Sequence, residues 1–104
     1  MSVRWTSEAT QQLINIKLYI AKDDVNAASK QIKKLILRAE SLMQPPLLGR
    51  MVPEVGQAHI RELLERPYRI IYTIIDAQPW VLTIWHYRRI LNSSDIASTV
   101  RPLK

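Results

Sequence analysis

The spacing of apolar residues in this 104-residue chain changes once, and that change decides which folds are open to it. Within residues 9–20 the apolar side chains recur every three or four positions, as on one face of an amphipathic helix. A second stripe of the same period covers residues 28–42, and Pro45–Pro46 cannot extend it because neither proline has a backbone N–H to donate. From residue 58 onward the period is two, which is typical of strands. The chain therefore predicts helices followed by strands.

The segments that precede the two stripes carry the signals of helix starts. Residues 2–5 alternate polar and apolar side chains and predict one short strand. Thr6 or Ser7 then offers a hydroxyl as the N-cap of the first helix, and the carboxylates of Asp23 and Asp24 can cap the second. Because so short a link joins the two helices, we predict that they form an antiparallel hairpin.

Three segments in the second half, residues 58–65, 68–76 and 80–89, follow this period of two, and residues 68–76 are rich in β-branched and aromatic residues. Short turns separate them, so we predict three strands in an antiparallel meander. The connector at residues 45–57 holds three of the six prolines and both glycines. Connectors of this length within a compact domain are often functional. Residues 92–104 are polar and predict a loose tail.

This order of elements predicts an α+β fold, in which a short N-terminal strand and the helical hairpin pack on one face of an antiparallel sheet that contains the meander. We expect a single domain over residues 1–104, with its folded core at residues 1–91. The middle strand of the meander is apolar on both faces, with Ile71 and Ile75 on the same face as Arg69. Helices on one side can cover only one face. We therefore predict that the face of Ile71 and Ile75 is a partner surface.

Several classes of site are excluded by composition. The chain has no cysteine, and so no disulfide framework, thiolate nucleophile or cysteine zinc site. Two histidines are too few for a histidine-rich metal site. We therefore expect neither a metal nor another cofactor. Fifteen Lys and Arg residues against nine Asp and Glu residues give a net charge of +6, which favours a polyanion or an acidic protein as the partner.

The sequence also bears on location. Polar side chains at residues 6–8 and 10–12 lie where a signal peptide would have an apolar stretch. The longest apolar run is far shorter than the ~18–20 residues of a membrane span. We expect a cytoplasmic protein with no membrane partner.

Arginines on the predicted strands are the first candidates for a binding role. A sheet face with several guanidinium groups suits phosphates or carboxylates, because a planar donor can form bidentate hydrogen bonds. The alternative is that these arginines are solvated edge charges, paired with Glu62, Glu65 and Asp76. The candidate arginines are Arg61, Arg69, Arg88 and Arg89.

Two neighbouring residues near the end of the last predicted strand suggest a catalytic alternative. His86 and Tyr87 could act as general acid and base in RNA cleavage if burial and nearby arginines tuned their pKa values. A half-buried strand histidine with an ordinary hydrogen bond is the more common situation. Glu54 could serve as a general base, and Trp85 could stack on a base, although tryptophans more often pack in a core or at its rim.

Four short motifs carry a family resemblance. They are GRMVPE at residues 49–54, IREL at 60–63, YRIIY at 68–72, and His86 followed by Arg88 and Arg89. Together with the helical hairpin, they make the chain resemble the RelE/ParE superfamily of toxins from bacterial toxin–antitoxin modules. The resemblance covers nearly the whole chain, and the motifs are most similar to those of the ParE branch.

The branch decides what the resemblance implies. RelE-like members are ribosome-dependent messenger RNA endonucleases, whereas ParE-like members poison DNA gyrase without cutting RNA. Ribonuclease members place their acid–base side chains close to the C-terminus, whereas here seventeen residues follow Tyr87. This favours a ParE-like toxin of a type II toxin–antitoxin system that blocks replication. The alternatives are a RelE-like endonuclease that uses Arg69, His86 and Tyr87, and an inactive member that only binds its antitoxin.

The resemblance also implies the partners. We expect a ParD-like antitoxin with a ribbon-helix-helix DNA-binding N-terminus and an acidic tail, and DNA gyrase as the target. DNA would be contacted only through the antitoxin or gyrase. Under this interpretation no residue is catalytic. The predicted antitoxin- or target-binding residues are Arg61, Arg69, Ile71, Ile75, Trp85, Arg88 and Arg89.

Overall fold

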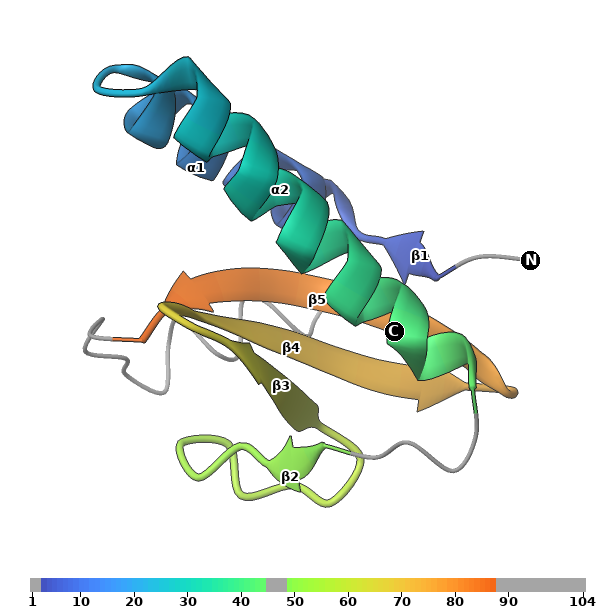
Figure 1. Cartoon of the computed structure of the whole chain (residues 1–104). Helices are drawn as coiled ribbons and strands as arrows, with labels where there is room; N and C mark the ends of the chain where they lie inside the picture. Colours follow the sequence, from blue (N-terminus) through green and yellow to red (C-terminus); the bar gives the residue numbers. More distant parts are fainter. Residues whose placement is uncertain (1–2, 45–48, 88–104) are drawn as a thin grey trace.

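The computed structural model describes residues 3–44 and 49–87. A helical hairpin lies over one face of a sheet, so that the elements form two layers (Figure 1). The helices and strands are β1 (Arg4–Trp5), α1 (Ser7–Ala21), α2 (Val25–Glu40), the 3₁₀ turn η1 (Ser41–Met43), β2 (Arg50–Met51), β3 (Arg61–Glu65), β4 (Tyr68–Ile75) and β5 (Gln78–His86). The predicted α+β fold, its hairpin and its three-stranded meander are confirmed.

Both helices begin where their caps predict. The Thr6 hydroxyl oxygen accepts a hydrogen bond from the backbone N–H of Ala9 at 3.0 Å, and the Asp24 carboxylate accepts one from Ala27 at 3.1 Å. Each bond satisfies one of the N–H groups that a helix start leaves without an intrahelical partner. The α2 helix ends at Glu40 and tightens into η1.

The sheet has five strands in the order β1-β5-β4-β3-β2. Strands β2 to β5 are antiparallel neighbours, but β1 runs parallel to β5, so the sheet is mixed rather than antiparallel throughout. Two helices separate β1 from the meander, and therefore no tight turn forces it to be antiparallel. The connector contributes β2, a strand that we did not predict. The last predicted strand ends at residue 86 rather than 89, and residues 88–104, including the predicted tail, lie outside the described residues.

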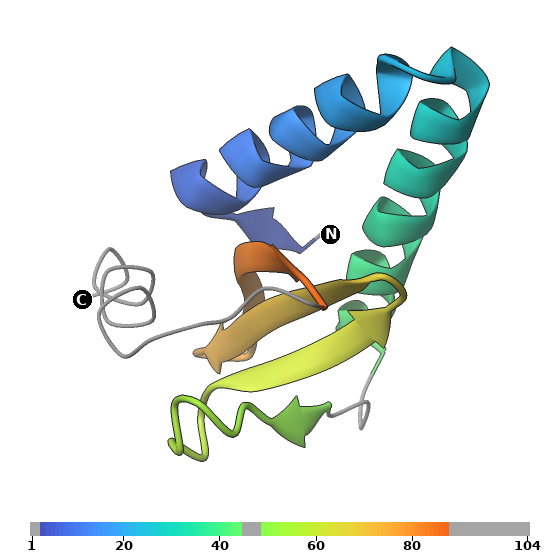
Figure 2. The same ribbon diagram turned by 90° about the vertical axis from the view of Figure 1, so that its left-hand side faces the viewer.

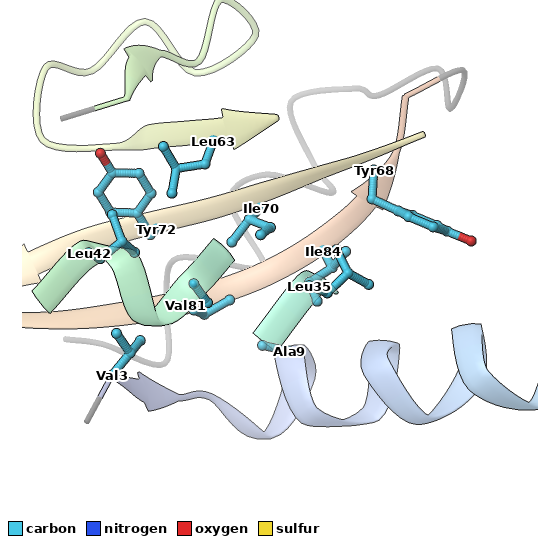
Figure 3. Close-up of a cluster of buried hydrophobic side chains, with 11 residues drawn as sticks. Val3, Ala9, Leu35, Leu42, Leu63, Tyr68, Ile70, Tyr72, Val81 and Ile84 are labelled. Atoms are coloured by element: carbon cyan, nitrogen blue, oxygen red, sulfur yellow. The ribbon is translucent and has the colours of Figure 1, made fainter. Parts of the chain in front are cut away.

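The larger core lies between the helices and the sheet (Figure 3). Leu35 of α2 is fully buried in this cluster, which also contains side chains of α1 and of strands β3 to β5, among them Ile70 and Ile84. Tyr68, at the start of β4, extends away from the other side chains of this cluster (Figure 3). The apolar stripes predicted for the helices are therefore the residues that cover this sheet face.

Most of the second sheet face is covered as well, so our prediction of an open partner surface was wrong at Ile71, whereas Ile75 at the end of β4 is 38% exposed. In the structure the connector runs on to Ile60, because β3 begins only at Arg61. It folds across this face and buries Val52 and Ile60 against Ile71, Leu82 and Trp85. Ile71 is only 1% exposed. The physical reason is that the connector carries apolar side chains of its own, and burying them removes both surfaces from water.

Candidate functional site

Arg69 lies at the centre of a buried cluster of charged side chains on the connector side of the sheet. Its Nε donates a hydrogen bond to Glu62 Oε1 at 2.8 Å. Its two terminal nitrogens donate to the two carboxylate oxygens of Glu54, at 2.9 and 2.8 Å. The Arg69 side chain is 7% exposed and that of Glu62 is fully buried, whereas the Glu54 side chain is 31% exposed. The Glu54 carboxylate therefore closes the cluster on its solvent side.

Arg50 extends the cluster to the edge of the sheet. Its Nε forms an ion pair with Glu62 Oε2, and its side chain is largely exposed. The four side chains, Arg50, Glu62, Arg69 and Glu54, thus alternate in charge and sum to zero. The Arg69 guanidinium carbon also lies 5.8 Å from the centre of the Trp85 ring, within the range of a cation–π contact.

The local fold explains why these side chains meet. Leu64 pairs with Arg69 and Glu62 pairs with Ile71 across β3 and β4, so Glu62 and Arg69 are diagonal neighbours on the same sheet face. Glu54 comes from a turn in the connector, in which the N–H groups of Val55 and Gly56 both donate to the carbonyl of Val52. This turn aims the Glu54 carboxylate back at the sheet.

These contacts keep both partners charged. Hydrogen bonds from Arg69 hold the pKa of the Glu54 carboxyl below its usual value, and the hydrogen bond to Glu54 raises the pKa of Arg69 against the opposing effect of burial. All three guanidinium nitrogens of Arg69 already donate to carboxylates. Because the Arg69 side chain is 7% exposed and Glu54 lies on its solvent side, an external phosphate would have to displace Glu54 before Arg69 could bind it.

The residues of the catalytic alternative do not come together. Arg69 pairs with Trp85 and Tyr68 pairs with His86 across β4 and β5. Neighbouring residues of a strand point to opposite faces, so Arg69 faces the connector whereas His86 faces the helices. The His86 ring packs edge-on against Tyr68, with ring centres 5.5 Å apart. The exposed Tyr87 ring instead lies 5.5 Å from the Arg66 guanidinium carbon.

Only some of the predicted binding residues reach the surface. Arg61 is half-buried and donates through Nε to the carbonyl of Ala58 at 2.7 Å, and Ile75 is partly exposed. The structure buries three of the predicted binding residues, Arg69, Ile71 and Trp85. Our expectation that their side chains are accessible to a partner is therefore corrected. Arg88 and Arg89 lie outside the described residues.

The sequence analysis missed a groove of about 460 Å³ beneath the hairpin. Its walls come from three directions: Asn15, Ile16, Tyr19 and Ile20 of α1, Gln31 of α2, and Pro67, Tyr68 and His86 at the end of the sheet. A second hollow of about 350 Å³ shares Pro67 and His86 with the groove and continues to Arg66 and Tyr87. One signal was present in the sequence, because Tyr19 is a large aromatic residue of α1 that lies off the core stripe and would need another surface to cover it.

Within residues 3–44 and 49–87, no three His, Asp or Glu side chains are grouped so that they could hold a metal ion. Likewise, neither of the two described helices is long and apolar enough to cross a membrane.

Comparison with known proteins decides the family. The model of the family described as "ParE toxin of type II toxin-antitoxin system, parDE" matches residues 3–91. This chain belongs to the ParE toxin family. A relative named "Putative toxin Y4kP", from Sinorhizobium fredii (strain NBRC 101917 / NGR234), is 31% identical over 84 residues, which cover 81% of this chain and 85% of that protein.

A solved structure shares the fold of this ParE-family chain. It is titled "Chromosomal ParDE TA system from P. aeruginosa" and superposes with a TM-score of 0.68 at 24% sequence identity. The alignment covers 83% of this chain and 95% of the other. The two-layer arrangement of hairpin and mixed sheet is thus shared by two sequences that have diverged widely.

Proposed function

We propose that this ParE-family toxin poisons DNA gyrase by binding it, stops replication without cutting RNA, and is neutralised by a cognate antitoxin. The proposal that the toxin does not cut RNA is supported chiefly by the hydrogen bonds of Arg69, because each of its three side-chain nitrogens donates to Glu54 or Glu62. A catalytic arginine must instead reach a scissile phosphate. The gyrase target comes from the family to which the chain belongs.

The separation of the candidate catalytic residues supports the same conclusion. A general acid and base must lie within hydrogen-bond reach of the reacting atoms, on the same side as the group that binds the phosphate. Here His86 faces the helices and Arg69 faces the connector, on opposite sides of the sheet. This arrangement disfavours the endonuclease that would use Arg69, His86 and Tyr87.

Expression in cells tests the target. Induction of the toxin should produce filamentous cells, an SOS response and gyrase-linked DNA breaks, while messenger RNA stays intact at early times. A folded His86→Gln variant should retain this toxicity, because glutamine keeps hydrogen-bonding ability but cannot titrate. Rapid cleavage of messages on ribosomes with unbroken DNA, together with a folded His86→Gln protein that has lost toxicity, would establish the endonuclease instead.

The antitoxin partner is proposed from the family and from charge. A toxin of net charge +6 attracts an acidic segment over distances set by the Debye length, about 8 Å at physiological salt. We expect the reading frame beside this one to encode a ParD-like protein with a ribbon-helix-helix N-terminus and an acidic tail. Its co-expression should abolish toxicity, and the association rate of the two purified proteins should fall as salt rises.

Two surface residues remain predicted contacts for gyrase or the antitoxin. Arg61 and Ile75 both come from the meander and are at least partly accessible. Charge reversal at Arg61 should weaken binding to the partner that uses it, chiefly through the association rate. We place this activity in the cytoplasm, where both proposed partners would be available.

A further inference from the structure

The carboxylate of Glu54 is bound to Arg69 in the way that a phosphate group would be bound. Each of the two terminal nitrogens of Arg69 donates to a different oxygen of Glu54, at 2.9 and 2.8 Å. A guanidinium forms the same pair of hydrogen bonds with two oxygens of a phosphate. Glu54 therefore occupies the donors that an external oxyanion would need.

The other walls of this site are formed without Glu54. Glu62 holds the Nε of Arg69 at 2.8 Å, and the centre of the Trp85 ring lies 5.8 Å from the guanidinium carbon. Both Glu62 and Trp85 are almost completely buried. The guanidinium is thus fixed in place and shielded from water on its sheet side, where hydrogen bonds are electrostatically stronger than in water.

The charge of the site would favour an anion once the Glu54 carboxylate is removed. Arg50 and Arg69 each carry a charge of +1 and Glu62 carries −1, so these three side chains sum to +1, and Glu54 brings the cluster to zero. The Glu54 side chain is 31% exposed and that of Arg69 only 7%. Removing the Glu54 side chain would therefore open a path from solvent to the buried guanidinium.

Contacts that do not involve the Glu54 side chain hold the connector backbone at this point. The connector lies on the side of the sheet away from the helical hairpin (Figures 1 and 2). Val52 is fully buried in the smaller core, and its carbonyl accepts hydrogen bonds from Val55 at 3.1 Å and Gly56 at 3.0 Å. Truncation of Glu54 should therefore leave a space beside Arg69, because the turn is anchored on its own.

We propose that Arg69 and its neighbours form a latent oxyanion site for a phosphate group, and that Glu54 masks this site as an autoinhibitory contact. A protein of net charge +6 attracts phosphate-bearing molecules in general. The masked site keeps its buried arginine from binding them. This inference goes beyond the proposed function, because it assigns a ligand class to Arg69 and a masking role to Glu54, and neither depends on gyrase as the target.

The decisive variant is Glu54→Ala, titrated with inorganic phosphate and followed by NMR. The signal of the Arg69 Nε–H should shift with saturable binding and a Kd of about 1–5 mM, as expected for two charge-assisted hydrogen bonds. The parent protein should bind phosphate at least about tenfold more weakly. If the variant is unfolded without a ligand, phosphate should refold it, because a ligand that binds only the folded state stabilises that state.

Two matched variants separate the site from a general effect of charge. Glu54→Gln and Glu65→Ala each raise the net charge by one, as Glu54→Ala does. Glu54→Gln keeps a side chain of the same size in the space beside Arg69, and Glu65→Ala leaves Glu54 in place on Arg69. Both should bind phosphate at least about tenfold more weakly than Glu54→Ala, because in neither is the space vacated.

A second ligand distinguishes the source of the phosphate group. A dinucleotide with a single phosphodiester, titrated into Glu54→Ala, tests whether a nucleic-acid backbone can enter. Binding of both ligands assigns the site to backbone phosphates, and binding of inorganic phosphate alone assigns it to free phosphate.

Four results would overturn the proposal. They are a parent protein that binds phosphate as tightly as Glu54→Ala, equal affinities in the three variants, an Arg69 signal that does not respond to phosphate, and an unfolded Glu54→Ala protein that phosphate does not refold. None of them bears on gyrase poisoning, which is tested separately by DNA breaks in cells that express the parent toxin.

Discussion

The two faces of the sheet are both buried, but by different physical means. On the helix face, eleven buried apolar residues pack together, whereas the two buried charged residues of the described part of the chain, Glu62 and Arg69, lie on the connector face. On the connector face, the buried cluster has only five residues, two of which come from a segment with almost no regular secondary structure. That segment is held in place by the ion pairs from Arg69 and Arg50.

The difference shows how a short irregular segment can cover a sheet. A helix satisfies its own backbone hydrogen bonds and needs only an apolar stripe, whereas the connector shares only a few backbone hydrogen bonds with the sheet. Its position is therefore specified by Val52, Ile60 and the carboxylate of Glu54. A buried ion pair of this kind adds little net stability when intact, but breaking it leaves a charge without compensation. The predictions below test this contrast.

Glu62→Gln should have the largest effect. The substitution leaves Arg69 buried with one of its two carboxylate partners gone, and the expected loss in the free energy of unfolding is about 3–5 kcal/mol. Glu65→Gln, on the same strand but only half-buried, is the control and should cost less than about 1 kcal/mol. Urea unfolding measures both. Equal effects of the two variants would show that the ion pairs do not hold the connector.

The same deletion on each face compares the two apolar clusters directly. Leu35→Ala on the helix face and Leu82→Ala on the connector face both truncate a fully buried leucine. We expect losses of about 4 and about 2 kcal/mol, because the connector can collapse into the cavity more easily than a packed helix can. Urea midpoints at equal m-values give the comparison. A larger loss at Leu82 would mean that the connector is the more rigid cover.

The two glycines of the connector should differ for a steric reason. A Cβ on Gly49 would lie 1.9 Å from the carbonyl oxygen of Glu62, so Gly49→Ala must push the connector away from β3, at about 2–3 kcal/mol. Gly56 has a φ of +67° and open space around it, so Gly56→Ala costs only the strain of a left-handed conformation, about 1 kcal/mol. Thermal unfolding of both variants should reproduce this order; the reverse order would place the tight contact elsewhere.

Glu54→Gln should have an effect as small as that of Gly56→Ala, but one that depends on pH. Because Arg69 lowers the pKa of the Glu54 carboxyl in the folded state, the ion pair stabilises the protein above the pKa of an unfolded glutamate, about 4.3. That contribution disappears as the pH falls through the lower pKa of the folded state. At pH 7 the variant should be about 1 kcal/mol less stable, since partial exposure screens the pair. Urea unfolding at pH 7 and pH 3 should show the difference shrinking; a constant difference would contradict the ionic role of Glu54.

Much of the fold could be predicted from local signals. The N-caps at Thr6 and Asp24, the helical stripes and the change to a period of two identified both helices and the three strands of the meander. The direction of β1 and the existence of β2 could not be predicted, because a two-residue strand carries no pattern of its own. Both exist only because a neighbouring strand offers them hydrogen bonds.

The candidate site was predicted less well, and Arg69 shows why. The sequence identified it as a guanidinium on a sheet face and offered two interpretations: a binding residue, or a charge at an edge paired with glutamates. The structure pairs it with Glu62, as the second interpretation allowed, but buries it, and the partner that closes the cluster is Glu54, fifteen residues earlier in the chain. Which carboxylate reaches a given arginine depends on how the connector folds back over the sheet.

The sequence by itself determined which segments are helices and strands, the net charge of +6 and the family motifs, because these depend on residue identity and on spacing within a few positions. Only the tertiary structure decided which faces are covered. It buried Ile71 and Trp85 under the connector, placed Arg69 and His86 on opposite sides of the sheet, and left the groove at Gln31 open. Whether a side chain is buried depends on which distant segment of the chain packs against it. Spacing within a few positions of the sequence does not contain that information.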